Sequence, residues 1–323
     1  MKKPKIAFYW CASCGGCEEA IVDLAEDILP IVDAVDIVMW PVAMDFKKSD
    51  IEKLKDNEIV VSFINGAIRT DEQEEMVKLF RKKSQMIIAF GSCAHLGGIP
   101  ALMNLKKKSD MFKTIYSDLQ SVENPKKTIP QVETKIGDGK VTLPAMHEEV
   151  KTLDQVIDVE YYIPGCAPPP DIIKDSITAI LQNKLPEKGT VLGATKSLCD
   201  TCPRKDSKPE KIKIKEIKRM PFVKIDDDKC FLAESVICMG PATISGCGER
   251  CINANMPCRG CFGPTKLVSD QGAKFLSALA SIIDSEDEDE IKNITDSVID
   301  PAGLFYMYSL ASSLGAKYFE NKD

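Results

Sequence analysis

The sequence predicts an α/β protein, with a parallel sheet covered by helices in its N-terminal domain and an irregular C-terminal domain. Short apolar runs alternate with amphipathic runs of helical spacing over residues 1–185, which favours a parallel sheet. Between residues 199 and 264 this periodicity fades, and cysteine, glycine and proline become frequent. Such a segment has little apolar area for its own core and needs cross-links, such as bound metal, to hold it together. We expect a linker at Pro186–Gly189, between domains at 1–185 and 186–323.

The elements follow from hydrophobic spacing, taken in chain order. The expected strands are Lys5–Trp10, Asp36–Trp40, Ile59–Ile64, Met86–Phe90 and Val156–Ile163. The expected helices are Glu18–Leu29, ending near Pro30, then Asp50–Asp56, Asp71–Lys83, Asp171–Gln182, Lys266–Asp284 and Ala302–Ser313. Residues 121–150 interrupt the alternation, and the turn residues within 135–139 predict a small hairpin. The acidic run at 285–290 is expected to be a solvated loop.

Composition and charge exclude several classes of protein. Of the 323 residues 44% are hydrophobic and 28% are charged, which is an ordinary globular balance. The net charge of −7 provides no basic field, so we expect no nucleic-acid partner. The longest stretch without Asp, Glu, Lys or Arg is residues 84–105, which includes three glycines and a proline and does not match a membrane helix. With no signal peptide pattern at its start, the chain is expected to be cytoplasmic, with no membrane partner.

The chain contains 13 cysteines, and they cluster at short spacings. Three lie within residues 11–17 and eight within residues 199–261. In a reducing cytoplasm these thiols are poor candidates for disulfides. Burial explains an isolated cysteine but gives no reason for clustering, so metal binding is the favoured interpretation.

In the first domain, each cysteine motif follows a predicted strand. The motifs are Cys11-x-x-Cys14-x-x-Cys17, Gly91-Ser92-Cys93 and Pro164-Gly165-Cys166. Carboxyl ends of parallel strands share one edge of a sheet, so these thiols could converge there on zinc or an iron–sulfur cluster. Only two of the first three are needed if the other two motifs complete a set of four. A Cys-x-x-Cys redox pair and simple burial are the alternatives.

The second domain holds eight cysteines, enough for two more sets of four. They are Cys199, Cys202, Cys230, Cys238, Cys247, Cys251, Cys258 and Cys261. Two structural zinc sites would also account for them. Iron–sulfur clusters are favoured because Pro203 follows Cys202, as in ferredoxin motifs, and because zinc here would leave the set at the sheet edge unexplained. Three sets of four leave one thiol spare, and three clusters suit stepwise electron transfer. His95 and His147 are both expected to be structural or surface residues rather than ligands. His95, two residues after Cys93, is kept as a candidate to support the ligands of the first set from outside it.

These motifs resemble the small subunits of [NiFe] hydrogenases over most of the chain. The matching segments are Cys14-Gly-Gly-Cys17-Glu-Glu19, Gly91-Ser-Cys93, Pro164-Gly-Cys166-Ala-Pro168, Cys199-x-x-Cys202-Pro203-Arg204, Lys229-Cys230, Cys238-x-Gly240-Pro241, Cys247 and Pro257-Cys258-x-Gly260-Cys261. The resemblance implies a flavodoxin-like first domain and three [4Fe-4S] clusters. The proximal cluster would take Cys14, Cys17, Cys93 and Cys166, leaving Cys11 spare. The distal cluster would take Cys199, Cys202, Cys230 and Cys238, and the medial cluster Cys247, Cys251, Cys258 and Cys261.

Two positions depart from many members of that family. Many carry histidine where Cys199 stands, and many lack a fourth medial thiol and hold a three-iron cluster. Because Cys251 supplies a fourth thiol, we expect a four-iron medial cluster here. Glu18 and Glu19 could lie near the large-subunit interface, but two acids at a solvated helix N-terminus would look the same.

The likeness is greatest to the methyl-viologen-reducing (F420-non-reducing) hydrogenases of methanogens. It implies an electron-transfer subunit of a cytoplasmic oxidoreductase of methanogenesis, with no catalytic residue of its own. The nickel–iron centre would lie in a separate large subunit, and electrons would leave through a small iron–sulfur subunit towards heterodisulfide reductase. An F420-reducing hydrogenase small subunit, a complex-I-like subunit with one cluster, and a zinc-stapled binding protein without a redox role remain the alternatives.

Overall fold

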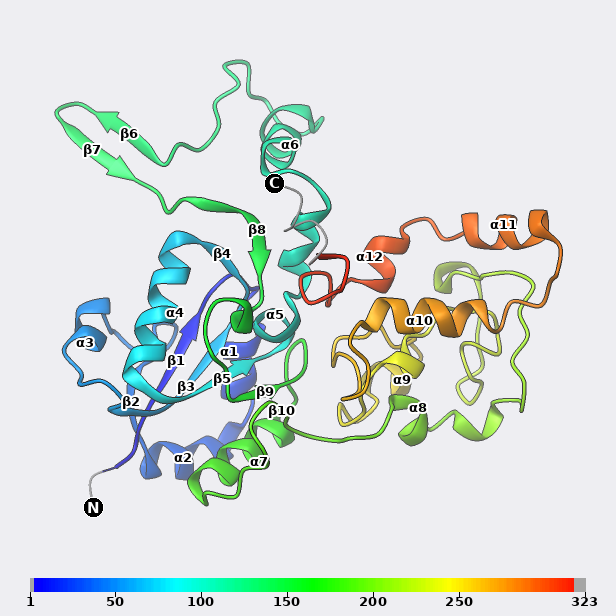
Figure 1. The fold of residues 1–323 in the computed structure, drawn as a ribbon, viewed down its shortest axis with the longest axis horizontal. Helices are drawn as coiled ribbons and strands as arrows, with labels where there is room; N and C mark the ends of the chain where they lie inside the picture. Colours follow the sequence, from blue (N-terminus) through cyan, green and yellow to red (C-terminus); the bar gives the residue numbers. More distant parts are fainter. Residues whose placement is uncertain (1–2, 317–323) are drawn as a thin grey trace.

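Six parallel strands form one sheet in the computed structural model, which describes residues 3–316. They are β1 (Lys5–Trp10), β2 (Asp36–Met39), β3 (Ile59–Asn65), β5 (Ser84–Phe90), β9 (Tyr161–Ile163) and β10 (Thr190–Val191). Their order across the sheet is β10-β9-β5-β3-β1-β2 (Figure 1). The first five strands along the chain therefore follow the 2-1-3-4-5 order of flavodoxin-like sheets. The predicted α/β class with a flavodoxin-like parallel sheet is confirmed.

Helices cover both faces of this sheet because its central strands are apolar on both sides. They are α1 (Gly16–Val22), α2 (Ile28–Ala34), α3 (Lys48–Glu52), α4 (Asp71–Lys83), α5 (Ser92–Leu96) and α7 (Pro170–Leu181). One core joins α1, α2 and α7 to Phe8 and Phe63, whose rings stack 5.1 Å apart. The opposite core joins α3, α4 and α5 to strand residues such as Ile64 and Ile87. This alternation along the strands is what a doubly covered parallel sheet requires.

Several predicted elements of this domain differ in extent; the helix expected over 50–56, for example, is formed at Lys48–Glu52. The helix expected over 18–29 ends at Val22, and α2 begins at Ile28 and includes Pro30. Proline is tolerated there because the first turn of a helix has no intrahelical partner for its N–H groups. The strand expected over 156–163 is formed only at Tyr161–Ile163. The sheet also continues into β10, just beyond Pro186–Gly189, where the N–H of Gly189 donates to the Glu160 carbonyl at 2.8 Å.

The C-terminal region contains only short helices around a core of its own. They are α8 (Leu198–Thr201), α9 (Arg250–Asn253), α10 (Gln271–Ala280), α11 (Glu288–Asp296) and α12 (Pro301–Phe305). The core holds Phe231 and Phe275 together with the thiols of Cys238 and Cys258. The acidic run expected to be a loop instead begins α11, because the Asp287 carboxylate caps its N-terminus and acidic side chains are favourable there.

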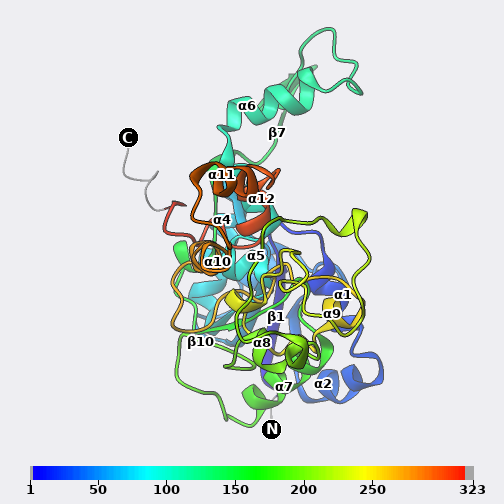
Figure 2. The same ribbon diagram turned by 90° about the vertical axis from the view of Figure 1, so that its right-hand side faces the viewer.

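Two further segments lie outside the sheet domain and the core of the C-terminal region. Between α6 (Lys108–Lys113) and β8 (Met146–Lys151), the chain forms the hairpin of β6 (Glu133–Ile136) and β7 (Gly139–Thr142), which projects from the molecule in both views (Figures 1 and 2). The predicted hairpin is thus confirmed. The helix expected over 302–313 stops at Phe305, and the chain after it returns to the sheet domain. Over the described residues, no helix has the length and apolar composition needed to cross a bilayer.

Candidate metal centres

Four of the predicted thiols lie where strands of the sheet end. Cys14 and Cys17 follow β1, at the switch point between β1 and β3, and Cys93 lies in the first turn of α5 after β5. Cys166 follows β9, and its loop is joined to the Cys93 loop by the Ser92 N–H, which donates to the Gly165 carbonyl at 2.8 Å. Cys17 and Cys93 are buried, whereas Cys14 and Cys166 are exposed.

The electrostatics of these thiols show that they are neighbours. Burial raises the pKa of the Cys17 thiol above its ordinary value, and negative charge on nearby thiolates raises it further. Those neighbours are the thiols of Cys93, Cys166 and Cys14, in decreasing order of effect. Burial also raises the pKa of Cys93 to about 12, again with contributions from Cys166 and Cys14. The sheet edge therefore brings this predicted set of four together.

Glycines keep space open beside these thiols. At Gly91 (φ +84°) an added Cβ would lie 2.4 Å from the Cys17 sulfur, and at Gly98 (φ +59°) it would lie 2.4 Å from the Cys93 sulfur. Any other residue would need both a strained left-handed backbone and room that the sulfur occupies. At these two positions glycine lets the backbone pack directly against the sulfur, with no side chain between them.

Cys11 lies apart from this set. Its side chain is buried in the core on the α3, α4 and α5 side of the sheet, among residues such as Met39 and Ile64. Cys17 packs in the opposite core. Burial alone raises the pKa of the Cys11 thiol. The structure therefore places Cys11 as an apolar core residue.

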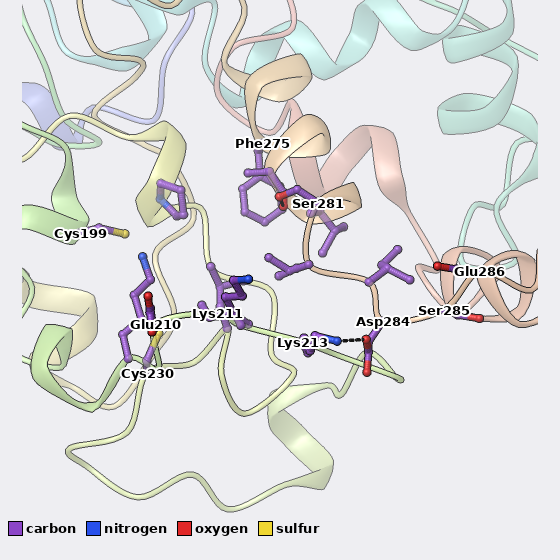
Figure 3. Close-up of a pocket in the computed structure, with 18 residues that line it drawn as sticks. Cys199, Glu210, Lys211, Lys213, Cys230, Phe275, Ser281, Asp284, Ser285 and Glu286 are labelled. Carbon is purple, nitrogen blue, oxygen red and sulfur yellow. Dashed lines mark hydrogen bonds and ion pairs between the residues drawn. The ribbon is translucent and has the colours of Figure 1, made fainter.

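Two thiols of the second set line a surface cavity in the C-terminal region. Cys199 and Cys230 line a cavity of about 720 Å³, together with lysines of the 208–213 segment (Figure 3). Burial raises the pKa of the Cys199 thiol to about 12, and the Cys238 thiol adds to this effect while the Lys208 ammonium opposes it. Weaker contributions come from the thiols of Cys230 and Cys202. These four thiols are therefore also neighbours.

The third set lies between the second set and the sheet. A cavity of about 460 Å³ is lined by Cys247, Cys251, Cys258 and Cys261, and also by Cys166. Backbone N–H groups point at several of these sulfurs. The N–H groups of Glu249 and Arg250 lower the pKa of the Cys247 thiol against the larger effect of burial, and the Gly260 N–H does the same for Cys258.

Direct contacts connect the three sets in one order. Burial raises the pKa of the Cys261 thiol to about 12, with a further contribution from the nearby Cys166 thiol, and the hydroxyl of Ser92, next to Cys93, donates to the Cys261 carbonyl. At the other end, the N–H of Cys258 donates to the Cys238 sulfur at 3.3 Å. The sheet-edge set therefore touches the third set, and the third set touches the second.

Comparison with known proteins identifies the family of this chain. The model of the NADH ubiquinone oxidoreductase 20 kDa subunit matches residues 14–180. The iron–sulfur subunit of the F420-non-reducing hydrogenase of Archaeoglobus profundus is 37% identical over 96% of this chain and 97% of its own length. A subunit of the F420-non-reducing hydrogenase of Methanothermobacter thermautotrophicus is 35% identical over 97% of this chain and 96% of its own length. The chain belongs to the family of hydrogenase small subunits.

A solved structure agrees with the fold of this small subunit. The [NiFeSe] hydrogenase of Desulfovibrio vulgaris Hildenborough has a chain that matches 83% of this small subunit and 95% of its own length, with a TM-score of 0.54 and 17% identity. The family also fixes the broad chemistry, because its members are subunits of oxidoreductases that act on hydrogen. The predicted family and enzyme class are therefore confirmed.

The donor groups of the small subunit fit iron–sulfur clusters. Among residues 3–316, no three Cys, His, Asp or Glu side chains form a ready-made site for a single ion. In a four-iron cluster the four thiolates bind four different iron atoms, so they stand farther apart than the ligands of one ion. Neighbouring thiols, N–H donors aimed at sulfur and glycine gaps beside it are the features that such clusters use. Burial raises the pKa values of these thiols and so favours their protonated form. Coordination to a metal would overcome this effect, because it deprotonates a thiol outright.

The burial of Glu18 beside the first site is a feature that sequence reasoning did not identify. The interpretation of a solvated helix N-terminus is wrong for Glu18, whose exposed fraction is 2%. Its carboxylate accepts hydrogen bonds from Trp40 Nε1, at 2.5 Å, and from Asn65 Nδ2. Burial raises the pKa of this carboxyl, and the two hydrogen bonds oppose that rise. The sequence does contain a signal for this burial, because Trp40 and Asn65 place an indole and a polar side chain at the ends of the two strands that flank β1.

His95 is half-buried. Its ring packs against Tyr162, with the ring centres 4.6 Å apart. Burial lowers the pKa of His95 to about 4, so its imidazole is neutral near pH 7. The structure thus places His95 against Tyr162 of β9, and its predicted position near the first set stays a prediction.

Proposed function

We propose that this small subunit carries electrons away from a [NiFe] large subunit through three [4Fe-4S] clusters, within a cytoplasmic hydrogenase. The observation that carries the proposal is the continuous series of thiol contacts, from Cys166 to Cys261 and from Cys258 to Cys238. A linear electron relay requires its sites to be neighbours, whereas structural metal sites with separate roles need not lie next to one another. Each bound cluster would accept and release one electron at a time.

In this proposal the sheet-edge set is proximal, the third set medial and the second set distal. The proximal ligands are Cys14, Cys17, Cys93 and Cys166. The medial ligands are Cys247, Cys251, Cys258 and Cys261, and the distal ligands are Cys199, Cys202, Cys230 and Cys238. The shared cavity supports Cys251 as the fourth medial ligand, and the core position of Cys11 supports its exclusion. The protein's part is to hold the thiolates, to donate N–H groups to their sulfurs and, at Gly91 and Gly98, to keep side chains away.

The distal set is the proposed exit. Cys199 and Cys230 line the surface cavity (Figure 3), so an electron acceptor that docks over this cavity would come close to both thiols. The names of the relatives favour the F420-non-reducing group over the F420-reducing one. We therefore propose a small iron–sulfur subunit as the acceptor, leading to heterodisulfide reductase in methanogenesis. No side chain of this chain needs to act as an acid or base in the reaction.

The test is a metal and sulfide count on the full chain, purified without oxygen. We expect about 12 iron atoms and about 12 acid-labile sulfides per chain, four of each for every cluster. Cys93→Ser should lose about four of each, whereas the matched variant Cys11→Ser should lose none. Zinc in place of iron, with no sulfide and no visible absorbance, would contradict the relay.

A further inference from the structure

Residues 106–145 form an arm that stands away from both domains (Figures 1 and 2). Nearly all of its side chains are exposed or half-buried. It consists of α6, a following irregular helical turn and the hairpin of β6 and β7. A two-stranded hairpin is marginally stable by itself in water, so an arm of this kind gains stability when another surface covers it.

The hairpin of the arm has one apolar face and one polar face. Thr134 pairs with Val141 and Ile136 with Gly139, and the Leu143 N–H extends the ladder to the Val132 carbonyl. Since side chains alternate across a strand, one face presents Val132, Ile136, Val141 and Leu143. Each of these four is between 50% and 63% exposed. The other face presents Glu133, Lys135, Lys140 and Thr142, with an ion pair between Lys140 and Glu133.

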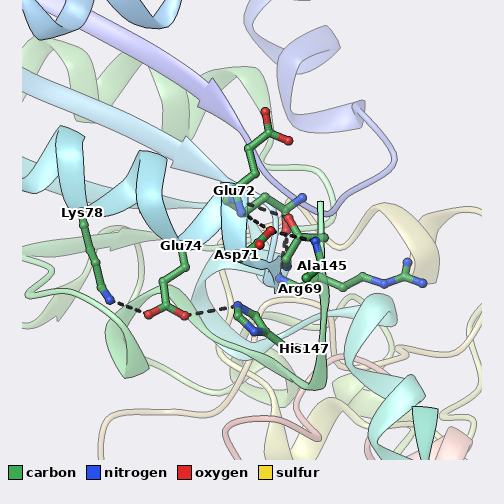
Figure 4. Close-up of polar contacts among 9 residues, drawn as sticks. Arg69, Asp71, Glu72, Glu74, Lys78, Ala145 and His147 are labelled. Atoms are coloured by element: carbon green, nitrogen blue, oxygen red, sulfur yellow. Dashed lines mark hydrogen bonds and ion pairs between the residues drawn. The ribbon is translucent and has the colours of Figure 1, made fainter. Parts of the chain in front are cut away.

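The base of the arm is held in a fixed direction. The N–H of Ala145 donates to the Asp71 carboxylate at 2.9 Å, and the Asp71 N–H donates to the Ala145 carbonyl at 3.0 Å. His147 lies 3.2 Å from the Glu74 carboxylate, which also binds Lys78 (Figure 4). Below these contacts, β8 pairs with β4 (Ile68–Thr70). The exposed apolar face is therefore presented at a defined position rather than on a free loop.

This base leads directly to the proximal edge of the sheet. β4 follows β3, and just before it Ala67 exchanges two hydrogen bonds of 2.9 Å with Ala12. Ala12 lies between Cys11 and Cys14, and both Cys14 and Trp10 are exposed beside it. The arm thus rises from the surface at which the first cluster is proposed to receive electrons. A partner that covers this surface is within reach of the arm.

We propose that the apolar face of the arm binds the large, hydrogen-splitting subunit, through an apolar patch on that subunit. This inference rests on the proposed function, which requires the large subunit to cover the edge at Cys14. The edge itself also exposes apolar side chains, because Trp10, Val42 and Met44 there are 40–52% exposed. The arm acts as a clamp that extends this interface beyond the sheet, with no part in ligating the clusters.

The test compares two substitutions in the anaerobically purified complex. Val141→Lys places a charge on the apolar face, whereas Thr142→Lys places the same charge on the polar face of the same strand. We expect Val141→Lys to weaken binding of the large subunit at least tenfold in a titration followed by size-exclusion chromatography, and Thr142→Lys to leave it unchanged. Iron per small subunit should be equal in both variants, because the arm lies outside the thiol sets.

Hydrogen exchange of the unmodified chain gives an independent measurement. The amides of 133–142 should exchange rapidly in the small subunit alone and become protected in the complex. Equal binding by Val141→Lys, or no added protection in the complex, would overturn the arm proposal while leaving the relay intact. If Val141→Lys instead lost a second copy of this chain or the electron acceptor while it kept the large subunit, that result would also overturn the arm proposal. Absence of iron from the unmodified chain would instead contradict the proposed function.

Discussion

The sheet domain and the C-terminal region hold their thiols in different ways. In the sheet domain, the cores on the two faces are built mainly from strand and helix side chains. Of the predicted proximal ligands, Cys17 belongs to one of these cores, whereas Cys14 and Cys166 lie exposed at the rim. In the C-terminal region, the thiols of Cys238 and Cys258 are part of the core itself, beside Phe231 and Phe275. A fold with its own core can carry a metal site at its edge. A region whose core includes the predicted ligand thiols themselves needs the metal to complete that core.

Removal of iron should produce the largest difference between the two regions in protection from hydrogen exchange. After anaerobic chelation, we expect the amides of 199–264 to lose protection from hydrogen exchange, because metal binding is coupled to folding there. The amides of β3 and β5 should stay protected, since their core does not depend on the thiols. Exchange resolved by mass spectrometry gives both readings in one sample, and equal loss in the two regions would contradict the difference described here.

Single thiol substitutions should show the same difference on a smaller scale. Cys14→Ala and Cys238→Ala should each lose about four iron atoms. Cys238→Ala should also lower the free energy of unfolding by about 1–3 kcal/mol, because the buried N–H of Cys258 loses its acceptor. Cys11→Ala is the control that should keep its iron. The iron count and a denaturant titration check the result, and a stability loss for Cys14→Ala as large as that for Cys238→Ala would count against it.

Surface charge should have the smallest effect, and Glu74 provides a measurement of it. The hydrogen bond from Lys78 lowers the pKa of the Glu74 carboxyl below its ordinary value. A carboxyl of this kind adds stability above its ordinary pKa and loses that stability as the pH falls through the lowered value. Relative to Glu74→Gln, the unmodified chain should therefore lose up to about 1 kcal/mol between pH 5 and pH 3. Parallel curves from thermal unfolding at these pH values would contradict the pairing.

The sheet and the convergence of thiols at its edge could be predicted from the sequence, because β1, β3 and β5 are continuous apolar runs and cysteines follow two of them directly. The burial of Glu18 could not. Two acids after Cys17 look like an ordinary helix start, and the partners that bury Glu18 come from the ends of β2 and β3.

The C-terminal elements show a second limit of prediction. Helical spacing continues beyond Phe305, but the helix stops there because the following chain makes contacts with the sheet domain. The Tyr308 carbonyl accepts from the Gly98 N–H at 3.0 Å, and the Ala311 carbonyl accepts from the Gln155 side chain at 2.9 Å. Local periodicity contains no information about such distant partners.

This returning segment has a mechanical consequence. A lobe joined to its neighbour by one linker can pivot about that linker, but the C-terminal region is attached at residues 190–197 and again at Tyr308 and Ala311. Two anchoring points on opposite sides oppose hinge motion between the lobes. The two attachments therefore hold the gap between Cys166 and Cys261 constant. In the proposed relay, electrons would cross this gap, and a constant separation would keep their tunnelling rate constant.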